Sequence, residues 1–369
     1  MKTILVTGAA GFIGSHVAEA LLRRGDRVIG LDNLSDFYEP ARKRGNLAEL
    51  QSLETAVNFR FVEADIRDRA ALGKVFSSAQ PEAIVHLAGM AGVRTSVDDP
   101  WLYYDVNLTG TLNLLDLAVG RGDPSLINDY LLAMPELSEE QRRELPKHVI
   151  ARALGVQDQE TVDLQSDDGR PNFVLASTSS VYGGTKTIPF VETDSADRPL
   201  APYPASKRAA ELLGHTYHHL YGLDFTALRF FTVYGPRNRP DMMAFKLLDG
   251  LRLDREVPFY NDGDMRRDWT FISDIVTGVV SAADRRLGYE VINLGRGEPV
   301  LLAEFVACME TLTGKRARLS TQPMPPADVA YTYANIEKAH ELLGYAPKVS
   351  VAEGVRRLYE WYRRAVGEV

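Results

Sequence analysis

A glycine-rich turn near the N-terminus constrains the fold of this chain more than any other feature. An apolar stretch at residues 3–6 leads directly into Gly8-Ala9-Ala10-Gly11-Phe12-Ile13-Gly14, after which apolar residues recur at helical spacing. A second apolar stretch, residues 27–31, ends at Asp32. Strand, glycine turn, helix and second strand are the parts of a dinucleotide-binding unit. The chain is therefore predicted to be an α/β protein with a doubly wound parallel sheet of the Rossmann type.

The residues of this unit also indicate which cofactor it binds. Glycines let the backbone approach a pyrophosphate closely, and the helix that follows offers N–H groups and the positive end of its dipole. A carboxylate at Asp32 can accept hydrogen bonds from the adenosine ribose and would repel a 2′-phosphate. The expected cofactor is therefore NAD and not NADP.

Two more strands are expected to bring residues to the cofactor. Residues 59–63 form one, followed by Asp65 and Ile66 within reach of an adenine. Residues 83–87 form the other, followed by the small residues 88–92. Small residues let the chain pass close to a cofactor, although they are equally compatible with an ordinary strand-to-helix connection.

A long helix is expected at residues 103–119, because apolar side chains recur there at helical spacing. Asn107 lies on this helix. It is either a core residue whose hydrogen bonds are satisfied or a contact near the site.

A tyrosine and a lysine lie four residues apart in Tyr203-Pro204-Ala205-Ser206-Lys207. On a helix this spacing places both on one face, and an adjacent ammonium lowers the pKa of a phenol from its usual value of about 10. Such a pair can move a proton to or from a substrate hydroxyl, which Thr178, at the end of an expected strand, could also hold. The pattern is common by chance, so it is the glycine turn earlier in the chain that favours a catalytic interpretation.

Composition and charge limit the partners of the chain. Its 369 residues carry a net charge of −8, which argues against a nucleic-acid-binding surface. Cys308 is the single cysteine, so an intrachain disulfide is impossible and a reducing, cytoplasmic location is expected. No apolar stretch approaches the ~20 residues that span a membrane. His215 and His219 have metal-compatible spacing without a supporting carboxylate or cysteine cluster, so no metal site is expected.

Together, the glycine turn and the Tyr203–Lys207 pair resemble the extended short-chain dehydrogenase/reductase family. Within that family the chain is similar to UDP-glucuronate 4-epimerases, on motifs spread over nearly its whole length. These motifs are residues 31–34 (LDNL), 86–94 (HLAGMAGVR), 177–183 (STSSVYG), 228–236 (LRFFTVYGP), 239–242 (RPDM) and 267–271 (RDWTF).

The resemblance implies roles for individual residues. Thr178, Tyr203 and Lys207 would be catalytic, with Lys207 both tuning Tyr203 and holding the nicotinamide ribose. NAD would be held by Gly8, Gly11, Phe12, Ile13, Gly14, Asp32, Asn33, Asp65, Ile66, Leu87, Ala88, Gly89, Ala91, Asn107, Tyr203, Lys207 and Phe230. The sugar nucleotide would be bound by Arg94, Ser179, Ser180, Thr232, Arg239, Tyr260, Arg267 and Asp328, with Arg267 at the diphosphate, Asp328 at the uridine ribose and Tyr260 near the uracil.

The implied activity is NAD-dependent 4-epimerisation of a UDP-uronic acid, UDP-glucuronate to UDP-galacturonate, through a 4-keto sugar. A UDP-glucose/galactose 4-epimerase is an alternative, against which Thr232 and Arg239 favour the acid. A 4,6-dehydratase is rejected because serines stand where it carries Asp-Glu, and Ser180 also counts against a UDP-glucuronate decarboxylase. An NAD-binding sensor or scaffold would tend to lose the tyrosine and lysine that this chain keeps. The expected assembly is a homodimer.

Residues 120–171 depart from the family pattern. About 50 residues intervene where the relatives have a short link, far above ordinary loop lengths, and Leu126, Ile127, Tyr130 and Leu131 have the spacing of a helix. Because this insertion follows a helix and precedes a strand, it should leave the sheet at the edge opposite the ligand-binding carboxyl ends. The expected domains are residues 1–235 for NAD, containing the insertion and receiving 269–297, and residues 236–369, mainly an interleaved α/β substrate domain.

Overall fold

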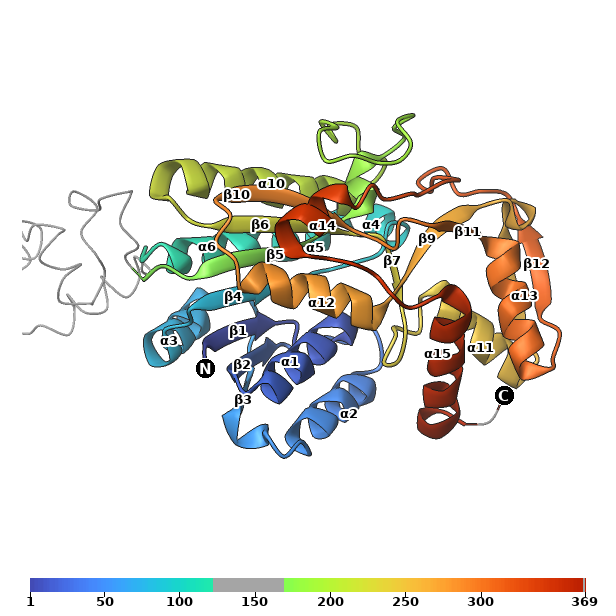
Figure 1. The fold of residues 1–369 in the computed structure, drawn as a ribbon, viewed down its shortest axis with the longest axis horizontal. Coiled ribbons are helices and arrows are strands. Elements are labelled where there is room, and N and C mark those ends of the chain that lie inside the picture. Colours follow the sequence, from blue (N-terminus) through green and yellow to red (C-terminus); the bar gives the residue numbers. More distant parts are fainter. Residues whose placement is uncertain (122–168, 368) are drawn as a thin grey trace, which may run out of the picture.

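A seven-stranded parallel sheet forms the centre of the computed structural model, which describes residues 1–121, 169–367 and 369 (Figure 1). Its strands lie in the order β10-β6-β5-β4-β1-β2-β3. Their bounds are β1 Thr3–Thr7, β2 Arg27–Asp32, β3 Phe59–Glu63, β4 Ala83–His86, β5 Asn172–Thr178, β6 Phe225–Phe230 and β10 Tyr289–Leu294. The order reverses around β1, and ligands of such sheets bind at the carboxyl ends beside the reversal. The predicted doubly wound fold is confirmed.

Alternate side chains of the strands enter two separate cores, one on each face of the sheet. In β1, Ile4 and Val6 pack on one face and Leu5 on the other, as the period of two in a strand requires. One face is covered by α1 (Phe12–Arg24), α2 (Pro40–Gln51) and α12 (Ile272–Ala283), and the other by α3 (Arg69–Ala79), α6 (Gly110–Ala118) and α10 (Pro202–Tyr221). Because both faces are covered, the central strands are apolar along their length.

The helix expected at residues 103–119 begins earlier and is interrupted. It starts with α5 (Pro100–Tyr104), because the side chain of Asp99 accepts a hydrogen bond from the Leu102 N–H and a proline occupies the first turn. A π-helical segment, η2 (Asp105–Thr109), separates α5 from α6. Such segments occur frequently at functional sites, and this one carries Asn107.

Two smaller sheets lie to the right of the large one in Figure 1, where β7 directly follows the carboxyl end of β6. β11 (Pro299–Leu301), β9 (Arg266–Phe271) and β7 (Thr232–Tyr234) form one sheet, and β12 (Arg318–Gln322) and β8 (Glu256–Tyr260) form the other. The remaining helices are α4 (Thr95–Asp98), α11 (Met243–Leu253), α13 (Leu302–Thr313), α14 (Glu337–Leu343) and α15 (Val351–Ala365), with short turns η1 (Ala56–Asn58), η3 (Ser179–Tyr182) and η4 (Asn261–Gly263).

The insertion leaves the described structure at the amino edge of the large sheet. On one side the Arg121 guanidinium donates to the hydroxyl of Tyr221 at the end of α10. On the other side Asn172 begins β5 opposite Ala83, the first residue of β4. The topological expectation for its attachment is therefore confirmed, whereas the helix predicted around Leu126 lies outside the described residues.

Candidate active site

Two clefts open at the carboxyl ends of the strands and share one wall. The first, of about 470 Å³, follows the ends of β1, β2, β3 and β4. The second, of about 530 Å³, lies between the large sheet and the smaller ones. Residues that line both clefts are Phe12, Ile13, Ala91, Ser177, Tyr203, Phe230 and Arg239. A ligand in each cleft would therefore meet the other beside Tyr203.

The glycine turn forms the floor of the first cleft. Its backbone lies so close to neighbouring backbone atoms that a side chain on these glycines would clash with them. Gly8 has a φ of +71°, and a Cβ there would lie 2.7 Å from the backbone nitrogen of Ala88. A Cβ on Gly14 would lie 2.0 Å from the carbonyl oxygen of Gly8. The bare main chain and the N-terminus of α1 therefore face the cleft, an arrangement that fits the pyrophosphate of a dinucleotide.

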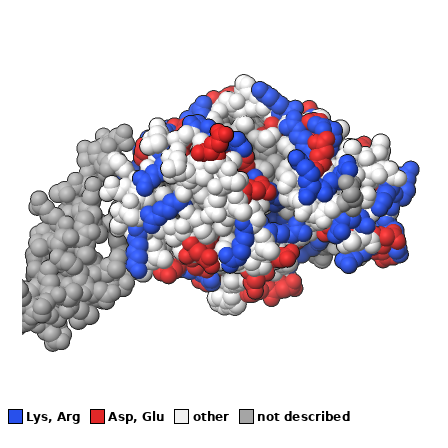
Figure 2. Space-filling model, turned by 90° about the horizontal axis from the view of Figure 1, so that it is seen from below, with Lys and Arg blue, Asp and Glu red and all other residues white. Residues whose placement is uncertain are grey.

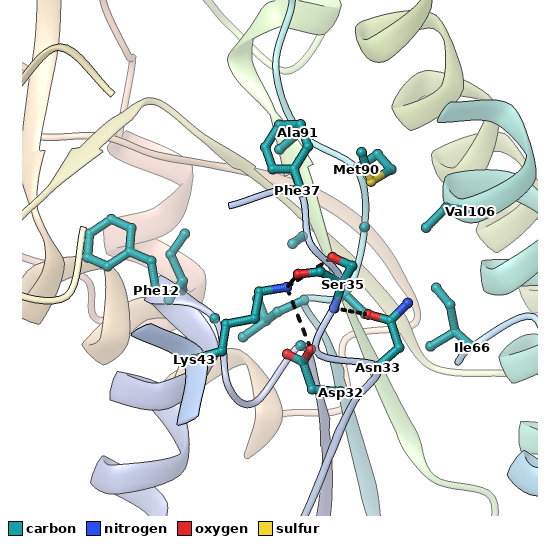
Figure 3. Close-up of a pocket in the computed structure, with 18 of the residues that line it drawn as sticks. Phe12, Asp32, Asn33, Ser35, Phe37, Lys43, Ile66, Met90, Ala91 and Val106 are labelled. Carbon is teal, nitrogen blue, oxygen red and sulfur yellow. Dashed lines mark hydrogen bonds and ion pairs between the residues drawn. The ribbon is translucent and has the colours of Figure 1, made fainter. Parts of the chain in front are cut away.

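Asp32 lies buried at the end of β2, beside a lysine that sequence reasoning missed (Figure 3). Its two oxygens accept hydrogen bonds from the N–H groups of Ala10 at 3.1 Å and Leu34 at 2.9 Å, which leaves further lone pairs for a ligand. The ammonium of Lys43 lies 4.0 Å away and donates to both oxygens of Ser35. Burial raises the pKa of Asp32, and Lys43 opposes that rise.

Lys43 belongs to α2, and no motif in the sequence marks it. Folding of α2 against the glycine turn brings it to the cleft, so only the tertiary structure reveals it.

A network of charges closes the first cleft beyond Asp32, at the ends of β2 and β3. Asn33 donates to Asp65 at 2.9 Å, and the guanidinium of Arg67 bridges Asp65 and Asp105, each at 2.8 Å. The hydrogen bonds from Arg67 lower the pKa of Asp65 to about 2, so this carboxylate is ionised. Asn33, Asp65 and Ile66 line the cleft as expected, and Arg67 is an addition that the sequence did not indicate.

Lys207 is buried at the opposite end of the first cleft. Desolvation lowers the pKa of its ammonium to about 8, and among the described residues no side chain or carbonyl forms a hydrogen bond or ion pair with it. A Cβ on Gly89 would lie 2.9 Å from the Lys207 nitrogen, so glycine at that position makes room for the ammonium. An unpartnered buried cation in a cleft lined by glycines fits the ribose hydroxyls of a dinucleotide.

Asn107 is the one predicted cofactor residue that does not line the first cleft. Its side chain accepts from the Met90 N–H at 2.8 Å and donates to the Met90 carbonyl at 3.0 Å and to Ser206 at 2.9 Å. The residue therefore holds the turn after β4 against α10, which carries Tyr203 and Lys207. This corresponds to the structural interpretation of Asn107, with the side chain behind the cleft wall.

Tyr203 is the second residue of α10 and faces both clefts. Burial keeps the pKa of its hydroxyl above the usual value, and a hydrogen bond with Thr178 and the charge of Arg239 oppose that rise. The spacing predicted that Lys207 would be the lowering group. In the structure the Lys207 ammonium lies beside Gly89. The groups that lower the pKa of Tyr203 are Thr178 and Arg239 instead.

Four cationic side chains and two carboxylates line the second cleft. Arg94 pairs with Asp328 at 2.6 Å and lies over the ring of Tyr260, with its guanidinium carbon 4.0 Å from the centroid. Arg239 is held by both oxygens of Asp241, at 2.9 and 2.6 Å. These two cations are therefore already neutralised within the protein.

Arg267 and Lys246 are the cations of the second cleft that form no ion pair with any described residue. Burial lowers the pKa of Arg267 to about 10, and its one hydrogen bond goes to the carbonyl of Arg266. Lys246, on α11, was not predicted. The cleft thus offers two uncompensated positive charges, which match a ligand such as a diphosphate.

The uncharged residues that were predicted to bind the sugar nucleotide or NAD also line the expected clefts. Ser179, Ser180 and Thr232 place hydroxyl groups along the second cleft, next to Thr178. Leu87, Ala88, Ala91 and Phe230 line the first.

Among the residues of known placement, no group of three or more His, Cys, Asp or Glu could hold a metal ion, and His215 instead makes an edge contact with Tyr289. Likewise, no helix of the described segments is long and apolar enough to cross a bilayer. Acidic and basic side chains are interspersed on the face seen in Figure 2.

Comparison with known proteins identifies relatives along almost the whole chain. Residues 4–295 match the model of the NAD dependent epimerase/dehydratase family. A UDP-glucuronate 4-epimerase of Thermodesulfobacterium geofontis is 39% identical over 367 residues, covering 99% of this chain and 98% of the relative.

Solved structures show the same fold. The UDP-glucuronic acid 4-epimerase of Bacillus cereus, in complex with UDP-glucuronic acid and NAD, superposes with a TM-score of 0.77 at 31% identity, covering 98% of this chain and 99% of that one. The dTDP-glucose 4,6-dehydratase DesIV of Streptomyces venezuelae gives a TM-score of 0.79 at 26% identity, covering 99% of this chain and 98% of the other. Because an epimerase and a dehydratase superpose about equally well, the site residues must distinguish the reaction.

Proposed function

This chain belongs to the NAD dependent epimerase/dehydratase family, and we propose that it is an NAD-dependent 4-epimerase that interconverts UDP-glucuronate and UDP-galacturonate. The observation that carries the proposal is the meeting of two clefts at Tyr203, one fitted to a dinucleotide and the other lined by uncompensated cations and a row of hydroxyls. The names of the relatives support the same reaction.

The first cleft is the proposed site of NAD. The glycine turn and the N-terminus of α1 would hold the pyrophosphate, Asp32 the adenosine ribose, and Lys207 the nicotinamide ribose. NAD bound there supplies a reversible acceptor for the hydride of C4. Since that hydride returns to the sugar in each turnover, the cofactor is expected to stay bound.

Tyr203 is the proposed base. Its hydroxyl, already in contact with Thr178, would take the proton of the C4 hydroxyl, while Thr178 holds the same oxygen. The positive charge of Arg239 favours the phenolate that this step needs. The 4-keto sugar then rotates, receives the hydride on its other face, and Tyr203 returns the proton.

The second cleft is the proposed site of the sugar nucleotide. Arg267 and Lys246 supply the two free cations for the diphosphate. Tyr260, Asp328 and Arg94 form one end of the cleft and would bind the uridine, with Asp328 at its ribose. Because Arg94 is neutralised by Asp328, it would act by covering the ring of Tyr260 and not as a phosphate ligand.

A uronic acid adds a third negative charge, and its oxidation at C4 makes a β-keto acid that loses carbon dioxide readily. Decarboxylation requires the breaking bond to stand roughly perpendicular to the ketone plane. Hydrogen bonds from Ser179, Ser180 and Thr232, with a charge-assisted pair to Arg239, would hold the carboxylate in an unreactive orientation. For that pair to form, the substrate must replace Asp241 on Arg239.

The ion pair between Arg239 and Asp241 also supports the second candidate, a UDP-glucose/galactose 4-epimerase. With Arg239 neutralised, the free charges of the cleft balance a diphosphate alone. A neutral sugar would leave the pair intact.

We also propose a homodimer in the cytoplasm. The exposed fractions of Trp101 on α5 and Leu212 on α10 are 84% and 52%, and these helices contact each other. Large exposed apolar side chains on adjacent helices are typical of an interface between subunits. We also propose the domain division expected from the sequence, with residues 269–297 joining the cofactor domain. The packing of α12 against one face of the large sheet and the place of β10 within that sheet support this part of it.

Incubation of the protein with UDP-glucuronate and NAD, followed by separation of the products, tests the activity. UDP-galacturonate is the expected product. Release of carbon dioxide with a UDP-pentose would instead identify a decarboxylase. Turnover restricted to UDP-glucose and UDP-galactose would establish the neutral-sugar alternative.

A further inference from the structure

A buried ion pair lies directly behind the proposed catalytic residues. Glu211 and Arg229 have exposed fractions of 0% and 1%. The two oxygens of Glu211 accept hydrogen bonds from two nitrogens of Arg229, at 3.0 and 2.8 Å. This contact joins α10, which carries Glu211, to β6, which carries Arg229.

Two further hydrogen bonds extend the pair to the catalytic elements. The hydroxyl of Ser177 donates to Glu211 at 2.5 Å, and Arg208 donates to its other oxygen at 2.9 Å. Ser177 immediately precedes Thr178 on β5. Glu211 follows Lys207 by one helical turn, on the same buried face of α10.

Stability alone gives a weak reason for such a pair. The free-energy cost of desolvating two charges offsets most of the energy of their attraction. Replacing such a pair with apolar residues of similar volume therefore often leaves the stability of the protein unchanged or increases it. In some proteins buried ionic groups fix geometry instead, because charge-assisted bonds with both carboxylate oxygens occupied favour a single arrangement. Here the arrangement that is fixed is the distance between the helix bearing Tyr203 and the strand bearing Thr178.

We propose that Glu211 is a positioning residue, which locks α10 to β5 and β6 so that Tyr203 and Thr178 hold one substrate oxygen between them. The proposal rests on the catalytic roles proposed above. Glu211 does not act as an acid or base, since it is fully buried and lines neither cleft.

The double replacement Glu211→Leu with Arg229→Met tests the proposal, because it removes both fully buried charges together. Arg208 loses its carboxylate partner, but its side chain is partly exposed and can be solvated by water. A purely structural role predicts unchanged kcat in any variant that folds with an unchanged Tm. Positioning predicts that kcat falls on the order of 10²-fold, as small misplacements do, with Tm and KM close to wild type. The pH profile of kcat should keep its shape, because the pair has no net charge and neither residue lines a cleft.

Ser177→Ala is the second variant and keeps the ion pair, so it remains informative if the double replacement does not fold. It should lower kcat and speed hydrogen exchange of the amides at 178–180 in the NAD complex, a measurement that needs no substrate. Tyr217→Phe is the matched control: it removes a buried hydrogen bond to Asp116 near the far end of α10 and should change neither quantity. Wild-type kcat and unchanged exchange in Ser177→Ala would overturn the positioning role. If the wild-type protein turns over no UDP-sugar, the proposed function is wrong. The hydrogen-exchange measurement needs no substrate, so it would still test the positioning role of Glu211.

Discussion

Arg239 and Tyr203 both line the two clefts where these meet, and the positive charge of the Arg239 guanidinium opposes the rise that burial causes in the pKa of the Tyr203 hydroxyl. The same guanidinium is held by Asp241 and donates to the carbonyl of Ala91. One arginine is therefore placed to contact the substrate and to act on the proposed base. These two actions can be separated by experiment.

Replacing Arg239 by alanine should change two quantities for two reasons. The KM for UDP-glucuronate should rise roughly 10–100-fold through loss of a charge-assisted pair, while that for any residual UDP-glucose activity changes little. The pKa of Tyr203 should rise, so the base-dependent limb of the kcat profile should move to higher pH with either sugar. Steady-state kinetics across pH measure both. Arg198→Ala, at an exposed residue, is the control; equal effects on the two sugars would contradict the carboxylate contact.

Tyr203→Phe removes the proposed proton acceptor and leaves the ring in place. Turnover should fall about 10²–10⁴-fold, as expected for a general base, and bound NAD should remain, since Lys207 and the glycine turn are untouched. Turnover and cofactor content of the purified variant provide the measurements. Near-normal turnover would exclude the assigned role.

Asp32→Ala removes the charged acceptor from the adenosine ribose. NAD affinity, measured by calorimetry on protein stripped of cofactor, should fall about 10-fold or more with the loss of charged hydrogen bonds. The variant also leaves Lys43 without its nearby carboxylate, so discrimination against NADP should decrease. Glu39→Ala, at an exposed residue before α2, is the control. Unchanged affinity for NAD would show that Asp32 does not meet the ribose.

The insertion should be dispensable for catalysis. Its two attachments lie at the amino edge of the sheet, at Arg121 and Asn172, whereas both clefts open at the carboxyl edge. Replacing residues 122–168 with a short linker should therefore leave kcat and KM nearly unchanged. Kinetics of the soluble deletion variant test this, with circular dichroism as the control for folding. A folded variant without activity would show that the insertion serves the site.

His86 should make the protein sensitive to acid. It is fully buried between the hydroxyls of Thr7 and Thr111, and desolvation lowers its pKa to about 3. The unfolded chain takes up this proton near pH 6.5, so the unfolded state binds more protons between pH 6.5 and 3. Stability is therefore full above pH 6.5 and is lost as pH falls.

At pH 5 the loss from this residue should be about 2 kcal/mol. Urea unfolding of the wild type and of His86→Gln at pH 7 and 5 measures it by difference, which cancels the contribution of other groups. If both proteins lose the same stability between these pH values, His86 is not the cause.

The sequence by itself determined the elements of the fold and the direction of many side chains. β3 has the predicted bounds, and the other predicted strands differ by a single residue at one end. The glycine turn, Asp32 and the Tyr203–Lys207 spacing could be interpreted because each is a local pattern, and local spacing fixes which face of a strand or helix a residue occupies. With the motifs shared with a known family, these patterns predicted residues that all line the clefts except Asn107, but they missed Lys43, Arg67 and Lys246.

Only the tertiary structure decided which charges meet. Lys43 and Lys246 belong to helices whose sequences contain no recognisable binding motif. The packing of these helices in the folded chain brings both lysines to the clefts. Asn107, which lies in a π-helical segment, is held behind the wall by hydrogen bonds with Met90, 17 positions earlier in the chain. The pKa of Tyr203 depends on Arg239, 36 positions further along the chain, rather than on Lys207 four positions away. Burial and electrostatic interactions depend on distance in space, and the spacing of residues along a chain fixes that distance only within one element.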